Sequence, residues 1–398
     1  MKVNIFLCLI GVILFIIGCS SSRNSEDSLA CIDINKNYPE KEINIADIAD
    51  IVYVHLDTKN EDYLYKGGID YISENNIVIC DNYSGSILFF STNGKPKSRF
   101  NRYGVGPKEY SSTRSIIIYD EYEDDLFINC YGKILVYSST GEYKRTLTSP
   151  QGISVDRIVD FDDLSLLAYD SKRVYEKMNK PSDIKHISSH YKDSSFFCVS
   201  KKDGKVLDYV ILPNNEIDLS FILRNGLLRA VPIYNRVVRC AEGVLLCNHE
   251  ADTIFLYNKD KSLIPIIYKT PSARDLDPVV ILDNFINTSK YQFMQTLTLS
   301  DYNGINGKFP PKYYIRDTKT GEIFIQKVIL SDYKEKKMYI SAENTLFNGK
   351  ETLFHFELNL IELKQAYYEN KLSGKLKELV ATLNEEEDNN VFMFVYFK

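Results

Sequence analysis

Tryptophan is absent from the 398 residues, and no apolar run after residue 17 is long enough to span a bilayer. Basic residues are outnumbered, with 48 Lys and Arg against 54 Asp and Glu, and they form no basic stripe. A nucleic-acid partner is therefore not expected, because phosphate binding requires clustered positive charge. Glycine and proline, at 19 and 12 residues, are too few for a low-complexity chain.

Catalytic and metal-binding signatures are also scarce. The sequence contains no G-x-S-x-G motif and no S-x-x-K motif with supporting partners. Of the five histidines only His186 and His190 are close together, and no glutamate follows the first, as it does in the zinc-protease helix. We therefore predict no catalytic residues, no metal site and no cofactor, and an enzyme is the less favoured class.

Cysteine is present eight times, but without a C-x-x-C pair, which disfavours a zinc ribbon or a redox motif. Cys8 lies in the leading apolar run, and Cys19 ends it. The other six are widely spaced, and most lie in strand-like apolar runs such as those ending at Cys80 and Cys247. We predict buried free thiols rather than a disulfide framework or a metal site.

Residues 1–18 have the pattern of a secretory signal peptide, with a positively charged start and an apolar run too short to span a bilayer comfortably. The run ends in Ile-Ile-Gly-Cys at residues 16–19, which resembles the lipobox of bacterial lipoproteins. This resemblance implies that Cys19 is the lipidation site, with residues 19–40 as the lipidated tether. Ser20 after the cysteine resembles an outer-membrane sorting signal, so we predict a lipid-anchored cell-envelope protein of the outer membrane. An ordinary secretory peptide with an incidental cysteine is the alternative.

A strand followed by a polar hairpin turn recurs five times along the chain. The first two copies are Ile87-Leu-Phe-Phe-Ser-Thr-Asn-Gly94 and Ile134-Leu-Val-Tyr-Ser-Ser-Thr-Gly141. The turn positions 94, 141, 204, 261 and 321 are separated by 47, 63, 57 and 60 residues. Each interval suits one four-stranded blade with its loops. The repeat therefore predicts an all-β propeller.

Five copies leave a sixth blade to be assembled from both ends of the chain. Unpaired strand-like runs occur at 51–54 and 391–397, and two further runs occur at 338–341 and 352–358. We predict that these four runs form one composite blade, because closure removes exposed sheet edges. The predicted domain is thus a six-bladed β-propeller over residues 41–398, closed by N- and C-terminal strands.

A segment at about 361–384 departs from the strand pattern. Leu376, Leu379, Val380 and Leu383 follow the i, i+3, i+4, i+7 spacing of an amphipathic helix. We predict a helical excursion that packs against the propeller before the last strand. A partner-binding helix is the alternative.

Residues 102–110 read Arg-Tyr-Gly-Val-Gly-Pro-Lys-Glu-Tyr. They resemble the R-x-G-x-G-P-G-E-Y loop of the six-bladed β-propeller lipoproteins of Bacteroidota, an NHL-repeat-like family mostly of undetermined function. The run Glu-Glu-Asp-Asn-Asn-Val at 386–391 resembles the acidic D-N-P-V ending of that family. Lys108 and Asn390 depart from the family, which has glycine and proline there. Lys108 indicates that its backbone position does not need a positive φ.

The candidate loop motif consists of Arg102, Gly104, Gly106, Pro107, Glu109 and Tyr110. We expect a mainly structural role, in which the glycines allow a tight turn between blades, Pro107 fixes that turn, and Arg102 pairs with Glu109. A ligand contact is the alternative. A phosphate cradle is disfavoured because no G-K-[ST] ending and no helix follow.

Rigid blades that hold many loops around one axial pocket favour a binding or scaffold module for a protein, peptide or glycan. The resemblance to NHL propellers, which include lyases, implies a second class, a lyase or hydrolase in the channel. That class predicts at least two histidines or carboxylates from different blades meeting at the axis, and His249 is one candidate. A structural subunit of an envelope complex is the third class, and it predicts an exposed apolar patch.

Overall fold

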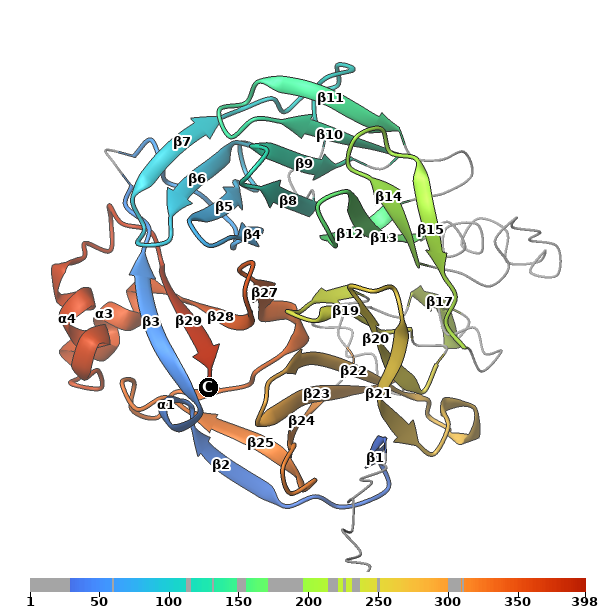
Figure 1. Ribbon diagram of the computed structural model, residues 1–398. Helices are drawn as coiled ribbons and strands as arrows, with labels where there is room; N and C mark the ends of the chain where they lie inside the picture. The colour runs from blue at the N-terminus through green and yellow to red at the C-terminus, as the bar shows by residue number, and fades with distance from the viewer. Residues whose placement is uncertain are drawn as a thin grey trace, which may run out of the picture.

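The computed structural model describes residues 29–58, 61–111, 116–130, 132–148, 155–170, 196–213, 221–224, 227–230, 237–248, 251–299, 309 and 311–398. Its strands form six blades of four antiparallel strands, arranged radially around a central axis (Figure 1). The predicted all-β, six-bladed propeller is therefore confirmed.

The strands of each blade follow one another in the sequence, from the axis to the rim, in the first five blades. Blade 1 contains β4 (Tyr71–Ile72), β5 (Asn76–Cys80), β6 (Ile87–Ser91) and β7 (Pro96–Phe100). Blade 2 contains β8 (Ile116–Asp120), β9 (Asp125–Asn129), β10 (Lys133–Tyr137) and β11 (Tyr143–Thr148). Blade 3 contains β12 (Val155–Asp160), β13 (Ser165–Asp170), β14 (Phe196–Ser200) and β15 (Val206–Val210).

Blades 4 and 5 follow after a separate hairpin made of β16 (Phe221–Arg224) and β17 (Leu227–Ala230). Blade 4 contains β18 (Val237–Arg239), β19 (Gly243–Leu246), β20 (Thr253–Asn258) and β21 (Leu263–Thr270). Blade 5 contains β22 (Val280–Asn287), β23 (Tyr291–Thr298), β24 (Pro311–Asp317) and β25 (Ile323–Ile329).

Blade 6 joins the two ends of the chain, as predicted. Its strands, from the axis outward, are β27 (Thr345–Phe347), β28 (Thr352–Leu358), β29 (Val391–Phe397) and β3 (Ala49–His55). One part of the prediction is wrong, because the run at 338–341 does not belong to this blade. β26 (Lys337–Met338) instead pairs with Val328 and Ile329 of β25, so its backbone extends the edge of blade 5.

The N-terminal segment forms two further strands before blade 6. β1 (Ala30–Asp33) pairs in parallel with β21, and β2 (Glu40–Asn44) pairs in parallel with β25. They cover the outer edges of blades 4 and 5, and the short helix α1 (Ile45–Ile48) then leads to β3 (Figure 1). The propeller therefore begins earlier than the predicted boundary at residue 40, because the backbone of residues 30–33 is already paired.

Apolar side chains fill the spaces between neighbouring blades. The middle strands β5, β9 and β14 are buried at every position, so both of their faces are apolar. Between blades 1 and 2, for example, Val78 and Phe89 pack with Ile117 and Ile128. The predicted free thiols are confirmed: Cys31 is half-buried, and Cys80, Cys130, Cys198, Cys240 and Cys247 are buried.

The hairpin turns of the repeat have a left-handed backbone at positions 94, 141, 204, 261 and 321. Gly94 has φ +86°, and a Cβ there would lie 2.0 Å from the carbonyl oxygen of His55, so a larger residue cannot fit. Gly141, Gly204 and Gly321 share this conformation, and Lys261 adopts it with φ +67° at the fifth turn. The backbone conformation at this turn position is therefore the same in all five copies, although one of them has lysine in place of glycine.

The predicted helical excursion consists of two short helices, α3 (Leu360–Tyr368) and α4 (Gly374–Thr382), inserted between β28 and β29. They lie outside the ring beside blade 6 (Figure 1). Leu363, Leu376 and Val380 are fully buried within the core cluster that also contains Val391 and Val395. Among the described residues, every helix is too short or too polar to cross a membrane.

Candidate functional site

A cavity of about 360 Å³ lies at the axis of the propeller. Residues of the innermost strands of blades 1, 2, 3, 4 and 6 line it, and these strands contact one another in turn around the axis. About half of the lining residues are apolar, and nine polar side chains line the cavity with them. They are Asp70, Tyr71, Asn82, Arg157, Asp160, Arg239, Glu343, Thr345 and His355.

Asp70 lies just before β4 in blade 1. One of its carboxylate oxygens accepts a hydrogen bond of 2.6 Å from the backbone N–H of Cys80. Burial raises the pKa of the Asp70 carboxyl to about 7, because the charged form is poorly solvated there. Near neutral pH this group therefore exists in both protonation states, and it can donate or accept a hydrogen bond.

Asp160 ends β12 in blade 3, and a lysine from the same blade binds it. Lys201, in the turn between β14 and β15, places its Nζ 2.8 Å from Asp160 Oδ1 and 2.9 Å from Asp120 Oδ2 of blade 2. Burial raises the pKa of Asp160, while the positive charges of Lys201 and Arg239 act in the opposite direction. The buried lysine thus joins two blades at the edge of the cavity.

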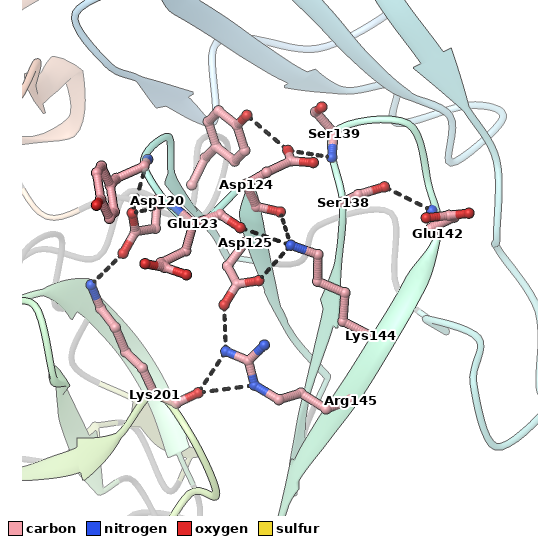
Figure 2. Close-up of polar contacts among 12 residues, drawn as sticks. Asp120, Glu123, Asp124, Asp125, Ser138, Ser139, Glu142, Lys144, Arg145 and Lys201 are labelled. Atoms are coloured by element: carbon pink, nitrogen blue, oxygen red, sulfur yellow. Dashed lines mark hydrogen bonds and ion pairs between the residues drawn. The ribbon is translucent and has the colours of Figure 1, made fainter.

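This ion pair belongs to a larger polar network between blades 2 and 3. Figure 2 shows Lys201 reaching Asp120 on one side, while its backbone carbonyl faces Arg145. Arg145 donates to that carbonyl and forms an ion pair with Asp125, and Lys144 Nζ binds Asp125 Oδ1 at 2.9 Å. All of these charged groups have partners within the protein, so the network holds the blades together.

The two arginines of the cavity are less fully paired than the charged groups of that network. Arg239, at the end of β18, donates from Nη1 to the carbonyls of Cys240 and Gly243, both at 2.7 Å, and its guanidinium lies 4.9 Å from the centre of the Phe347 ring. Its Nε is buried and has no hydrogen-bond partner in the described part of the chain. Arg157, on β12, has neither a hydrogen bond nor an ion pair to any described residue. Both arginines therefore have donors free for a ligand.

His355 lies on β28 of blade 6. Burial lowers the pKa of its imidazole to about 4, so the ring is neutral at pH 7. Its Nδ1 is buried, with no hydrogen-bond partner among the described residues. Asp70 from blade 1 and Asp160 from blade 3 line the same cavity as His355. No three His, Cys, Asp or Glu side chains gather as metal ligands within the described ranges.

The loop at 102–110 lies away from this cavity, between blades 1 and 2. The predicted pairing of Arg102 with Glu109 is wrong for the described structure. Glu109 Oε2 instead accepts a hydrogen bond of 2.8 Å from Gly106 N, and Arg102 Nε donates to the carbonyl of Gly141 at 3.2 Å. The carboxylate turns inward because Gly104 and Gly106 leave room for it: a Cβ would lie 2.1 Å and 2.9 Å from Glu109 Oε2.

The other residues of the loop are bound just as closely. The Tyr110 hydroxyl is fully buried, donates to Gly85 O at 2.6 Å and accepts from Arg102 N at 3.0 Å. The carbonyl of Pro107 accepts from Lys133 Nζ at 3.1 Å. Lys108 is not among the residues with positive φ, as expected, and its Nζ lies 4.8 Å from the centre of the Tyr143 ring. These contacts hold the conformation of the loop, which is the structural role expected for it.

Several predicted positions lie outside the described residues: Cys19, His186, His190 and His249. Sequence reasoning missed the cavity residues, although a signal was present. Arg157 and Asp160 lie among the valines and the isoleucine of β12, and Arg239 ends the otherwise apolar strand β18. Charged residues in such strands are rarely buried without a partner or a ligand.

Three kinds of comparison place the chain among known proteins. A family model described as a 6-bladed beta-propeller matches residues 20–346. No curated protein matches the chain. Among solved structures, a protein of Bacteroides fragilis named as an exported protein shares 16% identity at a TM-score of 0.59, covering 93% of this chain and 99% of its own.

Two further solved structures are more distant. A protein of unknown function from Bacteroides caccae has 11% identity and a TM-score of 0.32, covering 63% of this chain and 76% of its own. The virginiamycin B lyase of Staphylococcus aureus has 10% identity and a TM-score of 0.31, covering 69% of this chain and 97% of its own. Both scores are too low to support any functional comparison.

Proposed function

The chain belongs to the DUF5128 family of 6-bladed beta-propellers, and we propose that it is an exported, lipid-anchored binding protein whose ligand occupies the central cavity. The observation that carries this proposal is the set of unpaired polar groups in one cavity. Arg157, Arg239 Nε and His355 Nδ1 all lack partners among the described residues. Buried polar groups in folded proteins nearly always have partners, so Arg239 Nε and His355 Nδ1 point to a ligand that completes their hydrogen bonds, and the half-buried Arg157 lines the same cavity.

The size and the construction of the cavity support a small ligand or the end of a larger one. Its volume of about 360 Å³ lies near the lower end of the range for ligand pockets. Five rigid blades supply its walls, so the polar groups are held in place before a ligand arrives. A glycan unit or a peptide end, as part of an envelope partner, fits this description.

Export and anchoring rest on the N-terminal pattern. The lipobox-like residues 16–19 make Cys19 the lipidated residue, and Ser20 favours the outer membrane. The name of the Bacteroides fragilis relative supports export. Ten residues lie between Cys19 and β1, so the rim of blade 4 would lie within roughly 40 Å of the bilayer.

A channel lyase or hydrolase is the second candidate, and a specific observation favours it. Asp70 has a pKa of about 7, where a general acid or base works best, and His355 lines the same cavity as a neutral base. This candidate predicts that the bound ligand is chemically changed. The Asp70→Asn variant would then bind the ligand without releasing product.

The proposal is tested by filling the cavity. Thr345 lines it, and Thr345→Phe would occupy ligand space, whereas Thr320→Phe makes the same change on an exposed hairpin turn. Thermal shift with glycan and peptide fractions of cell envelopes should show a stabilising fraction for the wild type and for Thr320→Phe. Equal stabilisation of Thr345→Phe would move the ligand away from the cavity and overturn the proposal.

A further inference from the structure

We propose that the cavity recognises a carboxylate on its ligand, held by Arg157 and Arg239. This inference rests on the proposed function, since it requires a ligand in the cavity, and it names the chemical group that the ligand carries. The two arginines come from β12 and β18, the innermost strands of blades 3 and 4, which pack against each other. Both side chains line the same cavity.

Contacts within the protein hold the side chain of Arg239 in place before a ligand binds. Its Nη1 donates to the carbonyls of Cys240 and Gly243, and its guanidinium carbon lies 4.9 Å from the centre of the Phe347 ring. These contacts fix the side chain and leave the buried Nε without a partner among the described residues. A guanidinium presents its N–H groups as a planar fork that matches a carboxylate. An anion at that edge would satisfy the unpaired donor.

Arg157 supplies a second cation with no partner in the described chain. Asp160, at the end of the same strand, is already bound by Lys201 Nζ at 2.8 Å. An unpaired arginine beside an axial cavity is costly unless solvent or a ligand satisfies it. Two arginines on adjacent blades therefore carry guanidinium N–H groups that form no hydrogen bond within the described part of the chain.

The acidic residues of the cavity decide which anion suits it. Asp70, Asp160 and Glu343 line the same space, so a doubly charged phosphate would meet more repulsion than a singly charged carboxylate. Asp70 and Asn82 can in turn exchange hydrogen bonds with hydroxyl or amide groups of the same ligand. The expected ligand is therefore polar, small and singly negative, either an acidic sugar or the C-terminal end of a peptide.

Calorimetric titration of the purified protein with matched probes tests this inference. The acidic probes are D-glucuronate and acetyl-Ala-Ala, and their neutral counterparts are D-glucose and acetyl-Ala-Ala amide. We expect one acidic probe to bind, its neutral counterpart to bind at least about tenfold more weakly, and the responding pair to identify the source of the carboxylate. Inorganic phosphate should bind more weakly than the carboxylate.

Arg157→Gln is the main variant, because this side chain has no partner among the described residues, and the melting temperature of the variant can be checked without ligand. It should weaken the acidic probe at least about tenfold, and Arg157→Lys should recover part of that loss. Equal binding of neutral probes, tighter binding of phosphate, no effect of Arg157→Gln, or no binding by either acidic probe would each overturn the inference. An envelope ligand lost in Thr345→Phe but kept in Arg157→Gln would leave the proposed function standing and refute only the carboxylate.

Discussion

The loop at 102–110 and the central cavity are two polar regions of this protein that differ in how their polar groups are paired. In the loop, Glu109, Arg102 and Tyr110 are bound by backbone groups of the loop and of blades 1 and 2. In the cavity, Arg157 and His355 Nδ1 have no partner among the described residues. The polar groups of the loop therefore hold blades 1 and 2 together. The cavity groups are left available to bind a ligand.

This difference gives a rule for stability. Removing a polar group that has its partners inside the fold leaves those partners unpaired, so it should destabilise the protein. Removing a group that lacks partners should cost little or should even stabilise the fold. Four substitutions test this contrast, in order of decreasing effect.

Lys201→Met should give the largest loss. It leaves Asp120 and Asp160 without their shared cation, and losing one side of a buried ion pair typically costs about 3–5 kcal/mol of unfolding free energy. Urea unfolding measures this loss. Lys202→Met, an exposed neighbour in the same turn, should change stability by less than ~0.5 kcal/mol. Comparable losses in the two variants would mean that the ion pairs do not hold blades 2 and 3 together.

Asp70→Asn should raise the free energy of unfolding above neutral pH, in contrast to the loss expected for Lys201→Met. The unfolded carboxyl ionises near its ordinary pKa of 3.8, whereas burial raises the folded pKa to about 7, so the folded state binds more protons between these values. Stability is therefore lost as pH rises through this window, by about 2–3 kcal/mol between pH 5 and pH 8.

The Asn side chain cannot ionise and still offers an oxygen to Cys80 N. Asp70→Asn should therefore remove that decline, which urea unfolding at the two pH values would show. Asp163→Asn, on an exposed turn, serves as the control and should keep the wild-type slope. An unchanged slope in Asp70→Asn would show that Asp70 is not the responsible group.

Tyr110→Phe should have a smaller effect within the loop. It removes a buried hydroxyl that binds both Gly85 O and Arg102 N, at a cost of about 1–3 kcal/mol. Thermal unfolding compares it with Tyr103→Phe, whose side chain is exposed and should tolerate the change. Wild-type stability in Tyr110→Phe would contradict a structural role for the motif.

Arg157→Gln should have the smallest effect on stability. No described residue depends on its guanidinium, so the free energy of unfolding should stay within ~0.5 kcal/mol of the wild type. The same urea titration measures it. A loss above 2 kcal/mol would reveal a structural partner and remove the contrast between the two regions.

The sequence by itself determined the architecture of this protein. Regular spacing of turns at 94, 141, 204, 261 and 321 indicated blades, because alternating strands and left-handed turn residues are local properties of the chain. Free strands at both ends indicated closure, and the thiols were correctly expected to be buried and free. The helical spacing near residue 376 was equally local and equally readable.

Only the tertiary structure decided which residues meet. Asp70 and His355 are 285 positions apart, yet they line one cavity, because the ring closes by pairing β3 with β29. The pairing of Lys201 with Asp120 likewise depends on how two blades face each other. Even within nine residues the partner of Glu109 was misjudged, since it depends on how closely a carboxylate can approach two glycines. Local patterns specify strands and turns, but contacts across the axis depend on long-range packing that no local pattern records.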